Sequence, residues 1–280
     1  MSQSEWAVAA FGLAAAVSWG GGDFSGGIAS RRVDAFAVAG VSRAIGVSTQ
    51  IILALALGEP APGLRALTWA VAAGVCGGMG LAALYRALAV GSMGVNAPIT
   101  AVVAAAFPVL FETLAQGPPT VLHAVGFALA LWGVWRLARP DGVEGRPRGV
   151  GLALLAGLAF GGFYILITRA GGPSVFWPLA AATGTSSVML FALAAASNPR
   201  LILMAAALPI TYACGVLDAG GNSFFVLAAH AGRLDVAAVL SSLYPLVTVL
   251  AAWLILKERV SRGQAAGIAA ALAAIPLIAA

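Results

Sequence analysis

Charged side chains are scarce in this sequence of 280 residues. Asp, Glu, Lys and Arg together make up 9% of the chain, whereas hydrophobic residues make up 61%. A soluble globular domain carries roughly 25% charged residues. With a mean hydropathy of +0.98, the chain has too few polar side chains to cover a soluble globule, and its composition therefore predicts a membrane protein.

Cysteine and histidine are also rare, which excludes several kinds of site. The two cysteines, Cys76 and Cys214, both fall within apolar stretches, so neither a disulfide framework nor a metal cluster is expected. His123 and His230 have no cysteine or second histidine at ligand spacing. A phosphate-binding Gly-Lys-Ser/Thr loop is lacking as well, which argues against an ATP-driven pump. We expect no metal and no other cofactor.

The excess of basic residues does not indicate a nucleic-acid partner. There are 15 Lys and Arg residues against 10 Asp and Glu, but no basic run is interleaved with aromatic residues. Arginines in the connections between spans set the topology of a membrane protein, and this interpretation suffices here. The partners that we expect are a lipid bilayer and a small-molecule substrate, with the chain acting as a monomer or a homodimer.

What the sequence has in place of charge is a series of long apolar runs. A membrane span needs about 20 apolar residues, and cutting the chain at polar and Gly/Pro clusters gives ten candidates. They cover residues 6–28, 36–57, 67–90, 95–115, 121–137, 150–168, 175–196, 201–229, 236–256 and 264–279. We therefore predict an all-α membrane protein with ten transmembrane helices.

The chain also shows a weak internal repeat. A hydrophilic stretch divides the spans into two sets of five, so we assign residues 1–138 to a first repeat, 139–148 to a linker and 149–280 to a second repeat. Trp19 and Phe160, each followed by glycines, are 141 residues apart, and Gly74 and Gly215 share this offset. Five spans per repeat force the two halves into opposite orientations, as in inverted-repeat transporters. A bundle without symmetry is the alternative, because glycine matches between glycine-rich segments are common.

Two spans carry glycine clusters near their centres. Paired glycine interruptions in corresponding helices of two halves are typical of a transporter binding site near the bilayer midplane. We expect the first and sixth spans to bend there, with hinges at Gly20, Gly21, Gly22, Gly161 and Gly162.

Residues 240–246, Leu-Ser-Ser-Leu-Tyr-Pro-Leu, and residues 257–261, Lys-Glu-Arg-Val-Ser, resemble the closing motif of EamA-type transporters in the drug/metabolite transporter superfamily. Trp19-Gly20, Arg43 and Pro108 are similar in the first half. The resemblance implies a ten-helix, inverted-repeat carrier that moves amino acids, other metabolites or drugs, often outward. The Glu-Arg element occurs only in the second half.

The orientation in the membrane is left open. Most Lys and Arg residues lie in the connections that follow odd-numbered spans, and the positive-inside rule then places both termini outside. Members of the family are usually drawn with both termini inside.

Four charged residues fall within apolar spans, namely Asp23, Arg43, Arg86 and Asp218. Such residues are costly in lipid and are functional by default. Asp23 and Arg43 lie at similar depths in adjacent spans, which predicts an ion pair that is either structural or grips a zwitterion. Asp218 is deeper, and we expect it to contact a proton or the substrate, or to pair with Arg86.

Several softer candidates accompany these charges. Trp19, Phe163, Tyr164 and Trp177 are suited to stacking on an aromatic or cationic substrate, although such residues more often serve packing. The remaining candidates are polar or aromatic residues that should face the interior: Asn96, Asn222 and Tyr244.

Together these features predict a secondary transporter of the bacterial cytoplasmic (inner) membrane, an exporter of a small organic metabolite or drug that works by alternating access, with proton coupling left open. A lipid flippase or a structural membrane subunit of the same fold is the alternative. An intramembrane enzyme is the weaker one, because no catalytic triad or paired-carboxylate loop is present.

Overall fold

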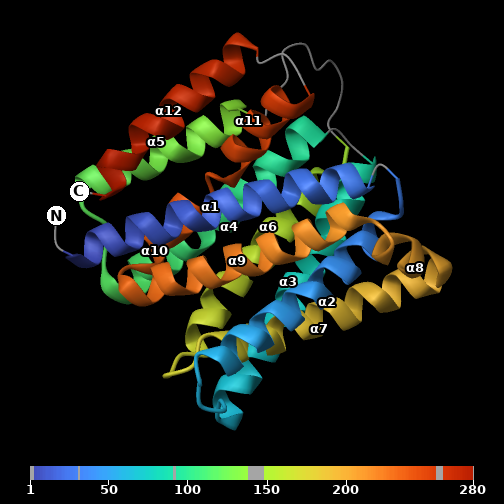
Figure 1. Cartoon of the computed structure of the whole chain (residues 1–280). Helices are drawn as coiled ribbons and strands as arrows, with labels where there is room; N and C mark the ends of the chain where they lie inside the picture. The colour runs from blue at the N-terminus through green and yellow to red at the C-terminus, as the bar shows by residue number, and fades with distance from the viewer. Residues whose placement is uncertain (1–2, 31, 91–92, 138–147, 257–260, 280) are drawn as a thin grey trace.

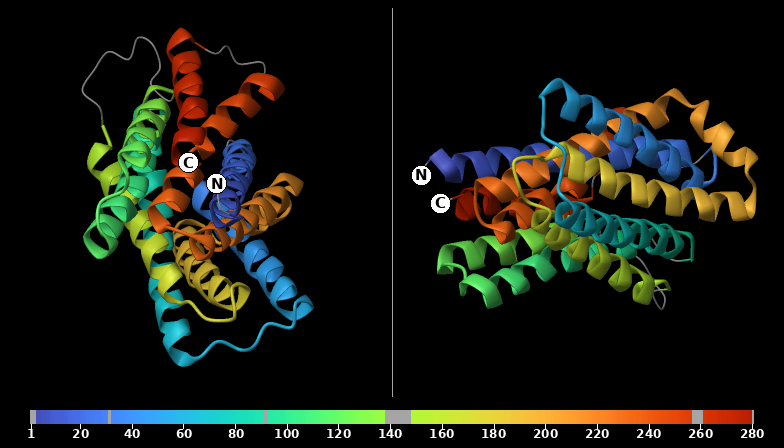
Figure 2. Two further views of the ribbon diagram at one scale, coloured as in Figure 1. Left: turned by 90° about the vertical axis from the view of Figure 1, so that its left-hand side faces the viewer. Right: turned by 90° about the horizontal axis from the view of Figure 1, so that it is seen from below.

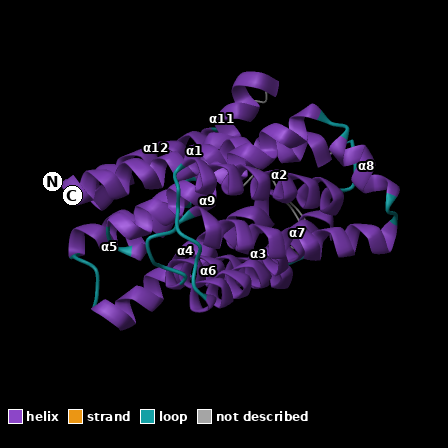
Figure 3. Cartoon of the chain, turned by 60° about the horizontal axis from the view of Figure 1, so that its bottom comes forward, coloured by secondary structure: helices purple, strands orange, loops and turns teal. Residues whose placement is uncertain are grey.

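The computed structural model describes residues 3–30, 32–90, 93–137, 148–256 and 261–279. Over these ranges the chain forms helices joined by loops, without any strand (Figure 3). The helices are α1 (Gln3–Ser30), α2 (Ala35–Ala56), α3 (Leu64–Val90), α4 (Met93–Gln116), α5 (Val121–Leu137), α6 (Val150–Arg169), α7 (Phe176–Ser197), α8 (Arg200–Ala206), α9 (Pro209–Ala231), α10 (Leu234–Ser241), α11 (Tyr244–Leu256) and α12 (Arg262–Ala279). The prediction of an all-α protein is confirmed for this part of the chain.

Seven of the described spans are long and apolar enough to cross a membrane, and the bent pair α8–α9 brings the number to eight. Helix α5 is a shorter apolar helix. Large apolar side chains cover the outside of the bundle, among them Leu114 and Val121, which are 81% and 82% exposed. Exposed apolar surface on this scale fits a lipid environment, so the chain is a multi-pass membrane protein. The count of ten spans stays a prediction.

Two predicted spans are not single helices. The eighth, 201–229, is divided into α8 and α9, whose axes differ by 81°. The break falls before Pro209, where Leu208 has extended backbone angles; proline lacks an N–H and disfavours helical geometry in the residue before it. The ninth, 236–256, is interrupted between α10 and α11, where Ser242 keeps helical backbone angles, and residues 234–255 still form one candidate membrane span.

Helices from the two halves of the chain pack against each other rather than within their own half. Helix α1 packs most extensively against α9, and α6 against α3 and α4. Helices α2 and α7 form another close pair, as do α5 and α12, which lie side by side (Figures 1 and 2). Helix α1 begins and α12 ends at the same end of the bundle.

Glycine clusters in α1 and α6 serve close packing. A Cβ added at Gly20 would lie 2.6 Å from the Tyr244 carbonyl oxygen, and one at Gly161 would lie 2.7 Å from the Phe107 Cβ. Small residues let membrane helices approach in this way. Both helices run without interruption through their glycines, so the expected hinges at Gly20–Gly22 and Gly161–Gly162 stay a prediction.

Candidate functional site

A buried ion pair joins α2 to α9 in the interior of the bundle. An Arg43 guanidinium nitrogen lies 3.1 Å from a carboxylate oxygen of Asp218, and the two side chains are 10% and 19% exposed. The Asn222 amide, one turn further along α9, donates to the same carboxylate oxygen over 3.4 Å. Glycine makes the contact possible, because a Cβ at Gly215 would lie 2.6 Å from the Ser42 carbonyl oxygen.

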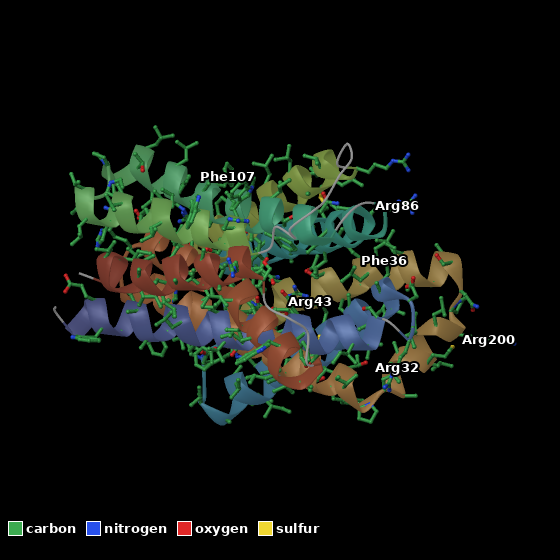
Figure 4. All side chains as sticks on the ribbon, turned by 90° about the horizontal axis from the view of Figure 1, so that it is seen from above. Arg32, Phe36, Arg43, Arg86, Phe107 and Arg200 are labelled. Carbon is green, nitrogen blue, oxygen red and sulfur yellow. The ribbon has the colours of Figure 1, made fainter. Side chains whose placement is uncertain are left out.

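The sequence suggested the ion pairs Asp23–Arg43 and Asp218–Arg86, and both are wrong. Arg43 pairs with Asp218 rather than with Asp23, because α2 packs closely against α9 and only slightly against α1. Arg86 does not reach Asp218. It is exposed near the end of α3, and Figure 4 shows it at the same end of the bundle as Arg32 and Arg200, whereas Arg43 lies farther inside. Depth along a span predicted which charges share a level, but not which helices are neighbours.

Asp23 lies on α1 beside this pair but makes neither a hydrogen bond nor an ion pair with another described residue. Its charge interacts with those of Asp218 and Arg43, and it lies on the same face of α1 as Trp19, one turn away. Asp23 is nevertheless exposed. The site thus contains two carboxylates and one guanidinium, with one carboxylate exposed and the other two groups largely buried.

An aromatic cluster adjoins the charged residues, on the side toward the N-terminal end of α1. The Trp19 ring stacks on Tyr164 with centroids 5.7 Å apart and meets the edge of Tyr244 at 6.5 Å. Tyr164 also contacts Phe163 at 6.0 Å and Phe225 at 4.5 Å. Four of the predicted aromatic residues are therefore brought together from α1, α6 and α11.

Phe225 is the member of this cluster that sequence reasoning missed. It is fully buried on α9, seven residues after Asp218 and hence on the same helical face. That spacing was the available signal. Gln50 carries a similar signal, since it follows Arg43 by seven residues on α2. It is fully buried, and both of its amide atoms lack a hydrogen-bond partner among the described residues.

Two predicted residues lie elsewhere. The Trp177 indole N–H donates to the Glu59 carbonyl oxygen over 3.2 Å, at the start of α7. The Asn96 amide donates to the carbonyl oxygens of Ala87 and Arg148, over 2.8 and 3.0 Å. Both side chains hold the ends of helices together, and neither belongs to the cluster around Asp218.

The opposite end of the bundle holds a second charged cluster that the sequence did not suggest. Arg233 donates to both carboxylate oxygens of Asp235, the closer contact being 2.8 Å, and Asp235 is completely buried at the start of α10. This hydrogen bonding raises the pKa of Arg233 and keeps it charged. Glu112 of α4 is 4% exposed and interacts electrostatically with this pair and with Arg169, whose guanidinium lies over the Phe111 ring.

These features form layers along the bundle. Asp23 is exposed about seven residues, or roughly 10 Å, from the end of α1. Beyond it, Phe163 and Tyr164 are each 6% exposed and Phe225 is fully buried, followed by the buried charges around Asp235. Among the described residues no group of His, Cys, Asp and Glu is arranged to hold a metal ion. The arrangement suits a polar binding site that is accessible at Asp23 and closed toward Asp235.

Comparison with known proteins agrees with this architecture. Residues 147–280 match the model of the EamA-like transporter family, and this match includes the ninth and tenth predicted spans that carried the resemblance. No curated protein matches the chain in sequence. A solved structure described as "Crystal structure of protein" superposes with a TM-score of 0.75 at 16% sequence identity, covering 96% of this chain and 95% of that chain. At this identity the superposition shows the fold alone.

Proposed function

Because the chain belongs to the EamA-like transporter family and is thus a membrane transporter of the drug/metabolite type, we propose that it moves a small organic solute by alternating access around Arg43, Asp218 and Asp23. The observation that carries the proposal is a deep charged cluster in which one carboxylate, that of Asp23, is exposed. Charged groups within membrane spans mark substrate and ion pathways when they face a wet cavity.

The layers beyond Asp23 support a state that is open at one end. The aromatic cluster of Trp19, Phe163, Tyr164, Phe225 and Tyr244 separates the exposed carboxylate from the opposite end of the bundle. Farther from Asp23, the charged cluster around Asp235 links the α9–α10 connection to α4. Transport then requires these two layers to separate while the Asp23 side closes.

Two hydrogen bonds between the halves support the two inverted five-helix repeats, because the donor lies in the first half in one bond and in the second half in the other. The Thr100 hydroxyl donates to the Ala153 carbonyl oxygen over 3.0 Å, and the Ser241 hydroxyl reaches the Gly12 carbonyl oxygen over 3.4 Å. Both members of one pair are 141 residues from their counterparts in the other. Such a pattern favours a twofold relation, in which the halves exchange conformations to expose the site alternately.

A second pair of contacts between helices supports the same twofold relation. Gly80 packs against the Phe160 ring and Gly221 against the Trp19 ring, again at the offset of 141. An unrelated bundle would have no reason to repeat both the residue type and its partner.

Export from the cytoplasm across a bacterial inner membrane is the direction we propose, as for many members of this family, with protons as the coupling ion. Asp23 and Asp218 are the groups that would carry a proton. Flux of candidate solutes into proteoliposomes, measured with and without an imposed pH gradient, tests this. Accumulation driven by the gradient is expected, and a flux that ignores the gradient would exclude proton coupling.

Orientation needs a separate test, because the charge distribution and the family picture disagree. Figure 4 shows Arg32, Arg86 and Arg200 at one end of the bundle, and the positive-inside rule places that end in the cytoplasm. A cysteine introduced at Gly142, in a background without Cys76 and Cys214, decides the question by labelling in intact cells. Gly142 and most of the predicted linker lie outside the described residues. Labelling from outside would contradict the charge rule.

A further inference from the structure

We propose that the substrates of this transporter are organic monocations, whose ammonium group binds the Asp23 carboxylate and whose apolar body lies against the aromatic cluster. This inference names the substrate class for the proposed transport function and rests on it. It depends on three features of the described residues: the charge balance of the site, the free carboxylate and the aromatic rings beside it.

The charge balance favours a cation. Asp23, Asp218 and Arg43 sum to one excess negative charge when ionised. Arg43 is already engaged, since its guanidinium contacts Asp218 at 3.1 Å and is mostly buried. An anionic substrate would therefore find no free positive group and would face an unpaired carboxylate. Desolvating such a like-charge arrangement costs free energy, whereas a monocation brings the site to neutrality.

Asp23 is the group that is free to bind. Asp218 already accepts contacts from Arg43 and from the Asn222 amide. Asp23 has neither a hydrogen bond nor an ion pair with another described residue, yet it is exposed within the site. A carboxylate in a protein interior needs a partner or water. The exposed Asp23 carboxylate is accessible to a ligand, and an ammonium group can supply this partner.

The aromatic rings supply the second half of the recognition. Trp19 lies one turn from Asp23 on the same face of α1, and Trp19 contacts both Tyr164 and Tyr244. The Asp23 charge interacts electrostatically with each of these tyrosines. Cations bind the faces of Trp and Tyr rings, and clustered aromatic rings recognise quaternary ammonium groups. A carboxylate beside three such rings is suited to a cation whose apolar part is about as large as one aromatic ring.

The test measures binding to the purified full-length protein by isothermal titration calorimetry and is independent of flux. Benzyltrimethylammonium is the permanent cation, neopentylbenzene is its neutral isostere, and phenylacetate is the anion. We expect only the cation to bind. Asp23→Asn should weaken its binding about tenfold or more, because a charge-assisted contact is lost, and Asp23→Glu should restore part of it.

Asp34→Asn is the matched control. It removes one carboxylate at the start of α2, where Asp34 accepts a hydrogen bond from the Ala37 N–H, and Asn caps a helix equally well. Cation binding should therefore be unchanged. Thermal unfolding of each variant establishes that it is folded. Asp23→Asn should unfold close to the wild-type temperature, because Asp23 has neither a hydrogen bond nor an ion pair with another described residue to lose.

Several results would overturn the inference. Equal binding by neopentylbenzene would mean that the site recognises shape alone, and undiminished binding to Asp23→Asn would place the cation elsewhere. Tighter binding of phenylalanine than of benzyltrimethylammonium would show that Arg43 also reads a carboxylate, so that the substrate is a zwitterion. A failure of the cation to bind at any soluble concentration also rejects the proposal. Each of these leaves the transport proposal standing, which only the flux measurement decides.

Discussion

One charged cluster lies deep in this bundle and a second lies toward one of its ends, and the two differ in balance and in access. The cluster of Arg43, Asp218 and Asp23 has two acids for one base, and one of the acids is exposed. The cluster around Asp235 contains Arg233, Arg169 and Glu112, so that two acids meet two bases, and both of its acids are buried. The same residue types thus serve different purposes.

The difference has a physical reason. A buried, balanced group of charges has its hydrogen-bonding capacity used within the protein, and it holds helices in register without attracting a ligand. An unbalanced group keeps a charge that only water, a proton or a substrate can satisfy. We therefore propose that the first cluster binds the substrate and that the second closes the opposite end. The following variants test that assignment, from the largest expected effect to the smallest.

Asp218→Asn should have the largest effect on function. It removes the charge that holds Arg43, and we expect flux in proteoliposomes to fall to background while the protein remains inserted and folded. If the pair is only structural, Asp218→Asn should instead lower thermal stability, and adding Arg43→Gln should restore both stability and flux. Proton-driven flux that is unchanged in Asp218→Asn would remove Asp218 from the mechanism and leave Asp23 as the candidate.

Asp235→Asn should act mainly on stability. It deprives Arg233 of its charged partner and weakens the hydrogen bond that the Val236 N–H donates to the Asp235 carboxylate over 2.8 Å. We expect a loss of about 2 kcal/mol in the free energy of unfolding, below the loss for a fully buried pair because Arg233 is partly exposed. Denaturation of the purified protein checks this. Binding of a cation at the other cluster should survive, and its loss would contradict the separation of roles.

Gln50→Leu should give the smallest effect and the opposite sign. Gln50 is fully buried, and neither amide atom has a hydrogen-bond partner in the described part of the chain, so a similarly sized apolar residue should stabilise the protein by about 1 kcal/mol. If Gln50 serves the substrate site next to Arg43, the stabilised variant should transport more slowly. A gain in stability with unchanged flux would restrict the site to Asp23, Arg43 and Asp218.

Much of the fold could be predicted from the sequence because membrane spans are local features. Apolar runs bounded by polar, glycine and proline residues placed α5, α6 and α7 to within one residue at each end. The sharp bend before Pro209 was missed, although the proline is visible in the sequence, because a run of apolar residues was treated as one helix. Hydropathy measures length in the membrane and is insensitive to a bend.

The candidate site was predicted in its members but not in its contacts. Asp23, Arg43, Asp218 and Asn222 were all expected to face the interior, because charged and polar groups in a span avoid lipid. Trp177 and Asn96 satisfied the same rule at helix ends. Composition alone does not separate a polar group that caps a neighbouring segment from one that lines a binding site.

By itself the sequence determined that this chain is a helical membrane protein and which of its residues lie deep within the bilayer, since both follow from the free energy of placing each side chain in lipid. The tertiary structure decided which deep residues meet. Helix α2 lies against α9, so Asp218 rather than Asp23 neutralises Arg43. The reason is that close approach of helices depends on matching small residues across an interface, such as Gly215 against Ser42. That match is a property of two distant segments together, and it leaves Asp23 as the open carboxylate of the site.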